Sequence, residues 1–193
     1  MIDPLYLFVF AGLFTPGPNV ILVVTSGARF GLRPTLPHIA GIAAGVAITS
    51  AATALGIGAL LLAVPALEWT LKVLSAGWIL WMAWTLARST GGAGGGRDRP
   101  FTFVEAVLFQ WVNPKIWAVA LAATSGYGSD LSPLWEAARI GSAFGGINLF
   151  VCTFWTAAGT WMRFLLGTPT AWRTFTLVMA SALALSAIGI FLA

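Results

Sequence analysis

Six apolar stretches, each about as long as a helix that crosses a bilayer, constrain the fold of this chain more than any other feature. A helical span needs about 20 mostly apolar residues. The sequence supplies such runs at about residues 5–27, 38–64, 67–87, 104–124, 138–162 and 172–192. Charged residues make up only 8% of the 193, against about 25% in an average soluble domain. We therefore predict a single-domain, all-α membrane protein with six transmembrane helices.

The basic residues predict how these spans are oriented. Cytoplasmic loops of membrane proteins carry an excess of Lys and Arg. The opposite connections here carry mainly acidic residues, Glu68, Asp130 and Glu136. We thus expect both termini to face away from the cytoplasm. Seven arginines would share the cytoplasmic side, namely Arg29, Arg33, Arg88, Arg97, Arg99, Arg163 and Arg173.

Several function classes lack the residues they need. The formal charge of +4 does not indicate a nucleic-acid partner, because the basic residues are scattered singly along the chain. A thiol–disulfide electron carrier, the main enzyme alternative, needs paired thiols, and Cys152 is the only cysteine. No Asp, Glu or His lies deep in a predicted span, so a divalent-metal carrier would lack ligands. We predict no enzyme activity, no metal and no cofactor; the partners are the bilayer and a small solute.

The first run is interrupted at its centre by the sequence FTPGPN, residues 14–19. Each proline removes a backbone donor and costs about 3 kcal/mol in a helix interior. A helix that restarts after such a break directs free N–H groups and a partial positive charge into the gap. These groups suit a carboxylate, and in a membrane they are tolerable only where they line a wet cavity or are buried in protein.

The fourth run contains a second interruption, WVNPK, at residues 111–115. Lys115 is ten residues from Glu105, and Asn19 is ten residues from Arg29, so both breaks lie about 15 Å from the cytoplasmic edge. Three spans per half turn the second half upside down relative to the first. We predict two inverted three-helix repeats with helices 1 and 4 broken, repeat 1 at about 1–88 and repeat 2 at about 101–193. A glycine-rich linker over 89–100 would join them.

Polar side chains near the two breaks are the candidate substrate-binding residues. Lys115 near the midplane needs a partner or a pore, and it could instead pair with carbonyls or a carboxylate for stability alone. Asn19, Asn113 and Gln110 could bind a polar solute or cap the freed backbone of their own breaks. Asn148, midway along span 5, could face the same cavity or join two helices.

Proton coupling would have few carriers in this chain. Without carboxylates deep in the spans, the candidates are Lys115, His38 and the amine of the substrate itself. His38 lies at the predicted cytoplasmic end of span 2, where it could equally be an interfacial residue with no special role.

Small residues recur at a spacing of four on two of the spans. Gly41 and Gly45 share a face of span 2, and Gly141 and Gly145 share a face of span 5. Such pairs let helix backbones approach closely. We expect them to pack helices within the bundle or at the interface of a homodimer.

The chain resembles the LysE/RhtB family of amino-acid exporters over essentially its whole length. The resemblance is carried by TPGPN at 15–19, GLRPTLPHIAGIAAG at 31–45, GWILWMAWTLARS at 77–89 and NPK at 113–115. AWTLARS and FQWVNPKIW are most similar to the subgroup that includes the cysteine/O-acetylserine exporter.

The resemblance implies proton-driven export of small amino acids or their derivatives from the bacterial cytoplasm, by six spans and often a dimer. It also implies that the chain lies in the inner membrane, with both termini periplasmic or extracellular. It assigns the binding site to two motifs, Pro16, Gly17, Pro18 and Asn19 in the first, and Asn113, Pro114 and Lys115 in the second.

The chain departs from the family pattern at two places. Many members carry an acidic residue where Val46 stands, and the common Pro-Gln-Phe after span 4 is replaced by TSGYG at 124–128. Two other functions stay open, export of another small solute or a cation, and a membrane subunit that transports nothing.

Overall fold

The structure, a computed structural model, describes residues 3–89 and 98–191. Within these ranges the chain is helical, and no strand occurs in them. The expected glycine run at 91–96 lies outside the described residues. The helices are α1 Pro4–Phe14, α2 Pro18–Phe30, α3 Leu32–Ala54, α4 Ile57–Ala63, α5 Pro65–Ala87, α6 Phe103–Trp111, α7 Pro114–Gly126, α8 Pro133–Met162 and α9 Pro169–Gly189.

Four helices, α3, α5, α8 and α9, are each long and apolar enough to cross a bilayer. Two further pairs meet the same test jointly but bend at a short break, α1 with α2 by 61° and α6 with α7 by 63°. Both bends are smaller than a right angle, so the chain continues forward through each break. The described part of the chain thus contains up to six spans, and both predicted breaks are present.

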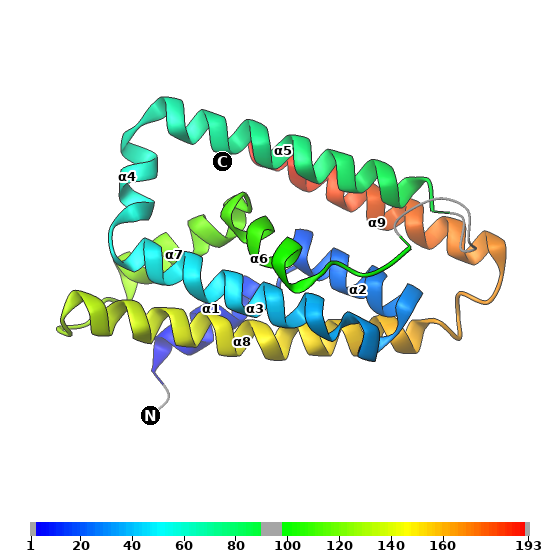
Figure 1. Ribbon diagram of the computed structural model, residues 1–193, viewed down its shortest axis with the longest axis horizontal. Helices are drawn as coiled ribbons and strands as arrows, with labels where there is room; N and C mark the ends of the chain where they lie inside the picture. Colours follow the sequence, from blue (N-terminus) through cyan, green and yellow to red (C-terminus); the bar gives the residue numbers. More distant parts are fainter. Residues whose placement is uncertain (1–2, 90–97, 192–193) are drawn as a thin grey trace.

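Successive spans alternate in direction along the long axis of the molecule (Figure 1). The α1–α2 pair runs from left to right in this view, α3 runs back, and α5, the α6–α7 pair, α8 and α9 continue the alternation. The C-terminal ends of α2, α5 and α8 consequently lie at the right-hand end. This is the end where the described members of the predicted basic set lie.

The second predicted span is wrong at both ends. We expected one helix over 38–64, whereas α3 begins at Leu32 and ends at Ala54. Gly56 follows with φ of 94°, a left-handed conformation that stops the helix. The rest of the expected span forms the short α4, which lies across the ends of the long helices at the left of Figure 1.

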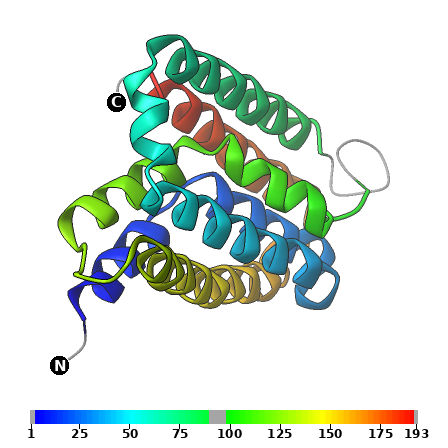
Figure 2. The same cartoon turned by 60° about the vertical axis from the view of Figure 1, so that its left-hand side comes forward.

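The long helices pack in two groups. Helix α3 packs along α8 and α6, and α2 packs along α8, whereas α5 and α9 pack on each other. Figure 2 shows α5 and α9 side by side at one edge of the bundle. Buried side chains from both groups form one core cluster that includes Ile42, Ile79, Phe144 and Leu183.

The four glycines singled out by their spacing lie at contacts within the chain. A methyl group on Gly41 would come within 2.4 Å of the Phe103 carbonyl oxygen of α6, and one on Gly145 within 2.9 Å of the Ala47 methyl of α3. Gly45 and Gly141 are equally crowded, against α6 and α3 respectively. Of the two expected roles, packing within the bundle is therefore confirmed.

Candidate functional site

The first break follows directly from its two prolines. A residue before proline is pushed out of the α conformation, and Thr15 and Gly17 both take extended ψ angles, 137° and −176°. Helix α1 therefore ends at Phe14, and α2 begins at Pro18, whose missing N–H costs nothing at a first helical position. The Thr15 hydroxyl donates to the Gly12 carbonyl at 2.7 Å, which ties down the end of α1.

The second break repeats this arrangement with one proline. Asn113 precedes Pro114 and is extended, with ψ of 100°, so α6 ends at Trp111 and α7 begins at Pro114. The carbonyls freed by the break have partners. The Trp117 indole donates to the Trp111 carbonyl at 2.9 Å, and the Ser75 hydroxyl of α5 donates to the Val112 carbonyl.

Three amide side chains join the two breaks. Asn19 donates to Gln110 Oε1 at 2.9 Å, and Gln110 returns a bond to Asn19 Oδ1 at 3.2 Å. Gln110 Nε2 also donates to the Ala106 carbonyl at 3.0 Å, and Asn113 donates to Gln110 Oε1 at 3.3 Å. Gln110 is fully buried, and these bonds use its two donors and both lone pairs. The amides thus hold one break against the other, and neither Asn19 nor Asn113 caps its own helix through its side chain.

We expect Gln110→Met to destabilise the fold, because it removes this link while keeping the volume of the side chain. Buried Asn19 and Asn113 would lose their partner, and an unsatisfied buried polar group costs about 1–3 kcal/mol. Thermal unfolding of the purified protein in detergent measures the change. Ser142→Ala is the control, since that hydroxyl bonds only to its own helix on an exposed face. Equal melting temperatures for the two variants would contradict a structural role for Gln110.

Lys115 extends from the start of α7 to the first break. Its ammonium donates to the Thr15 carbonyl at 2.6 Å and to the Thr15 hydroxyl at 3.0 Å. Gly17 leaves room for this approach, because a methyl group there would lie 3.0 Å from Lys115 Cδ and Nζ and would displace the side chain. Of the two expected kinds of partner, the described residues supply a carbonyl and a hydroxyl but no carboxylate. The third N–H of the ammonium remains for another acceptor.

A small cavity lies between the two breaks. Its volume is about 10 Å³, room for about one water molecule. Asn19, Asn113, Lys115 and Asn148 contribute its polar lining. Asn113 Oδ1 and Asn148 Nδ2 are buried and have no hydrogen-bond partner in the described part of the chain. Asn148 therefore faces the same cavity as the breaks, while its oxygen accepts a bond from Cys152 at 3.1 Å.

A much larger cavity, of about 670 Å³, begins at the breaks and extends toward the end of the molecule where α4 lies. This volume falls within the range of about 300–1,000 Å³ that is usual for small-molecule sites. Residues 16–18 and 111–115 line its inner part, and residues of α4, α5, α7 and α9 line the rest. All nine predicted site residues lie at this cavity, at the small one, or, for Gln110, directly behind them.

The lining of the large cavity includes residues that the sequence analysis did not select. Helix α5 contributes Glu68, Leu71, Lys72, Ser75 and Ile79, a stripe at intervals of three and four that marks one face of a helix. Glu68 and Lys72 pair at 2.9 Å near the outer end of the cavity. The spacing of these polar residues along one helix was the signal that could have identified them. From the sequence, Glu68 was used only to orient the spans.

His38, the second coupling candidate, lies apart from the breaks. It is 1% exposed, and its ring packs 5.0 Å from the ring of Phe101. Helix α3 begins six residues earlier than expected, so His38 lies in its second turn and is buried among the helices. His38 lines neither cavity at the breaks and contributes to a different one at the opposite end of the bundle.

The electrostatics of the large cavity favour an anion at its inner end. Helices α2 and α7 both begin there, at Pro18 and Pro114. Each helix start carries roughly half a positive charge, and its first N–H groups have no partner within the helix. Lys115 adds a full positive charge between them. The three contributions converge on residues 16–18 and 113–115.

The protein is thus a multi-pass helical membrane protein. Its two broken spans face each other across an interior cavity, with a lysine between them. The LysE type translocator family matches residues 10–193. The chain belongs to this family, which consists of translocators and not of enzymes.

Curated relatives agree with this assignment. The chain is 32% identical over 123 residues to the cysteine/O-acetylserine efflux protein of Klebsiella pneumoniae, a match that covers 63% of each chain. It is 33% identical over 112 residues to the protein of the same name from Salmonella typhimurium, and 34% identical over 112 residues to that from Escherichia coli O1:K1. The chain spans 57 to 63% of the length of these relatives. No solved structure matches the chain.

Proposed function

We propose that the protein exports small amino acids or their derivatives from the cytoplasm, with the substrate bound between the two breaks. The observation that carries the proposal is the cavity of about 670 Å³. Its inner end is formed by residues 16–18 and 111–115, and the latter include Lys115. A cavity with a fixed cation and two helix starts at one end suits a solute that carries a carboxylate. The relatives' names, cysteine/O-acetylserine efflux proteins, agree with such a solute.

In this proposal the substrate carboxylate binds to Lys115 and to the N–H groups at the start of α2. Lys115 has no carboxylate partner among the residues that the structure describes, so a carboxylate would complete its coordination. The free atoms Asn113 Oδ1 and Asn148 Nδ2 would bind other polar groups of the substrate. Asn19 and Gln110 would hold the two breaks in register.

The pairing of the helices supports two inverted repeats. Each helix of the first half has a counterpart in the second: α1 corresponds to α6, α2 to α7, α3 to α8 and α5 to α9. Exchanging counterparts turns the α2–α8 contact into α7–α3 and the α1–α8 contact into α6–α3. Both of the resulting contacts exist. The exchange leaves the α3–α8 and α5–α9 contacts in place. Each of these two pairs runs antiparallel (Figure 1), as a two-fold axis in the membrane plane requires.

The distribution of arginines supports an outward-facing state. With the arginine-bearing loops in the cytoplasm, the large cavity extends away from it and toward the side of both termini. Lys115 lies at this cavity, whereas His38 lies near the cytoplasmic end. Proton coupling through either residue belongs to the proposal, as does a homodimer.

Transport from preloaded proteoliposomes tests the proposed function. We expect labelled O-acetylserine or cysteine to leave vesicles that contain the protein faster than protein-free vesicles. We also expect an acidic exterior to accelerate release and a protonophore to cancel that acceleration. A release rate that does not change with the proton gradient would contradict proton coupling but not export itself. No release of any amino acid across a full panel would contradict the exporter and favour the non-transporting subunit.

A further inference from the structure

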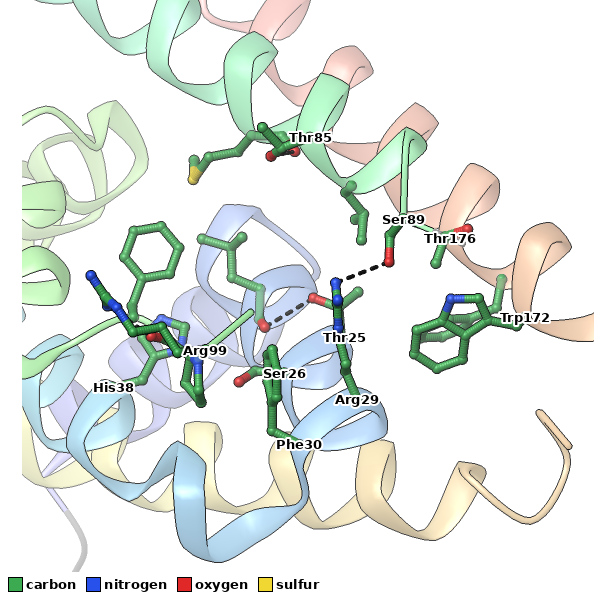
Figure 3. A pocket seen from close by; sticks show the side chains of 16 residues that line it. Thr25, Ser26, Arg29, Phe30, His38, Thr85, Ser89, Arg99, Trp172 and Thr176 are labelled. Carbon is green, nitrogen blue, oxygen red and sulfur yellow. Dashed lines mark hydrogen bonds between the residues drawn. The ribbon is translucent and has the colours of Figure 1, made fainter. Parts of the chain in front are cut away.

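A second cavity lies at the opposite end of the bundle from α4 (Figure 3). Its volume is about 80 Å³, and it is lined from α2, α3, α5, α9 and the segment before α6. Several hydroxyl groups and two arginines contribute to its lining. These include Ser26, Arg29, Thr85, Ser89, Arg99 and Thr176.

Arg29 is the cation of this cavity that lacks an anion. It is half-buried at the end of α2, and it donates one hydrogen bond, to Ser89 Oγ at 3.1 Å. Its guanidinium also lies 5.3 Å from the ring of Phe30. Within residues 3–89 and 98–191 no carboxylate pairs with it. A guanidinium has five donors and prefers a carboxylate with two parallel bonds, so most of its capacity is unused.

The other arginine of the cavity is in the opposite situation. Arg99 binds both carboxylate oxygens of Glu105, at 2.7 and 3.1 Å. This bond raises the pKa of the Arg99 guanidinium above its ordinary value. Its charge is therefore compensated, and an anion that enters the cavity would be attracted mainly by Arg29.

The second cavity and the large cavity are lined by the same faces of two helices. The face of α5 that lines the large cavity as far as Ile79 lines the second cavity from Met82 through Thr85 to Ser89. Only the buried side chains Ile79 and Met82, 1% and 3% exposed, separate the two cavities along this face. On α2, Pro18 belongs to the large cavity and Leu22 to the second. One continuous face of two helices therefore lines both ends, with apolar side chains closing the middle.

We propose that the Arg29–Ser89 cavity is a second binding site for a carboxylate, the site at which an amino-acid substrate enters from the cytoplasm before it reaches Lys115. The inference rests on the proposed export function and adds a site to it. The substrate carboxylate replaces Ser89 as the partner of Arg29. Because the Arg29–Ser89 bond joins α2 to the end of α5, this exchange frees the cytoplasmic ends of the two helices from each other.

Uptake into inverted membrane vesicles, whose cytoplasmic face points outward, tests the entry site with labelled O-acetylserine. We expect Arg29→Gln to raise the KM at least tenfold and Arg29→Lys to recover part of the loss. Arg88→Gln is the matched control, because Arg88 precedes Ser89 at the end of α5 and the substitution removes the same charge. Its exposed side chain packs on Trp84 outside the cavity. Equal KM values for Arg29→Gln and Arg88→Gln would overturn the proposal.

A labelling experiment separates failure of this site from failure of the export function. Thr85→Cys places a thiol in the cavity, and the native Cys152 is fully buried. We expect O-acetylserine to slow the reaction of the Thr85→Cys thiol with an impermeant maleimide. The methyl ester of O-acetylserine, which lacks the free carboxylate, should have no effect on this reaction. Arg29→Gln should abolish the protection, even if the protein transports nothing. Equal labelling rates with and without O-acetylserine, or protection that survives Arg29→Gln, would overturn the site.

Discussion

Lys115→Met should lower the rate of amino-acid efflux by about 10- to 100-fold, the effect of losing one charge-assisted hydrogen bond of about 1.5–3 kcal/mol. Methionine keeps the length and apolar stem of the side chain but provides no donor. The variant also removes the donor to the Thr15 carbonyl, but Thr15 is exposed and its hydroxyl keeps the bond to Gly12, so we expect the larger loss to fall on the substrate. Efflux of labelled O-acetylserine from proteoliposomes, at matched protein content, measures the effect.

Lys72→Met is the matched control for this variant. Lys72 lines the same cavity and carries the same charge, but it pairs with Glu68 at 2.9 Å and lies at the outer end. Its side chain is 24% exposed, and partly exposed ion pairs of this kind contribute little. We expect its efflux to stay within about twofold of the original protein. Retained transport in Lys115→Met would assign that lysine a purely structural role.

The location of the site could be predicted from the sequence because proline acts locally. A proline disfavours a helix at its own position and at the residue before it, and both breaks are at such prolines, although Pro37 lies inside α3. Thr15, Gly17 and Asn113 could therefore be placed outside helices without knowledge of the fold. The depth of the two breaks then followed from counting residues, and the structure brings them together through Asn19 and Gln110.

The far wall of the site could not be predicted in the same way. Ser75 and Ile79 line the large cavity only because α5 packs on α9 and faces α7 across a space. A sequence shows which residues share a helix face, but it does not show which face is turned toward a neighbour. The saturated hydrogen bonding of Gln110 and the missing carboxylate at Arg29 are likewise properties of the packed chain, not of local sequence.

Span boundaries failed where a single backbone angle outweighed hydropathy. The run 38–64 is apolar throughout, yet the left-handed Gly56 divides it. At the other end, Arg33 was expected between two spans, whereas α3 includes it and Pro37 as well. Arg33 lies in the first turn of α3, where it can reach polar surroundings, and a charge near a helix end is far less costly than one at the centre.

Gly27→Ala should destabilise the protein by about 3 kcal/mol, near the upper end of the usual cost of overpacking. A methyl group on Gly27 of α2 would lie 2.2 Å from the Thr156 carbonyl oxygen of α8. One turn away, a methyl group on Gly159 of α8 would lie 2.2 Å from the Val24 carbonyl oxygen of α2. Two glycines, one in each helix, thus bring the α2 and α8 backbones into direct contact, and the Thr160 hydroxyl adds a bond to the Gly27 carbonyl at 3.2 Å.

The crowding atoms here are backbone carbonyls, which cannot move aside as a flexible side chain could, so the helices themselves must separate. Gly146→Ala in α8 is the control, because nothing lies within 4 Å of its added methyl group. Alanine is a better helix former than glycine by roughly 0.5–1 kcal/mol, so this variant should be slightly stabilised. Thermal unfolding in detergent should therefore give shifts of opposite sign for the same chemical change. A melting temperature for Gly27→Ala equal to that of Gly146→Ala would contradict the backbone contact between α2 and α8.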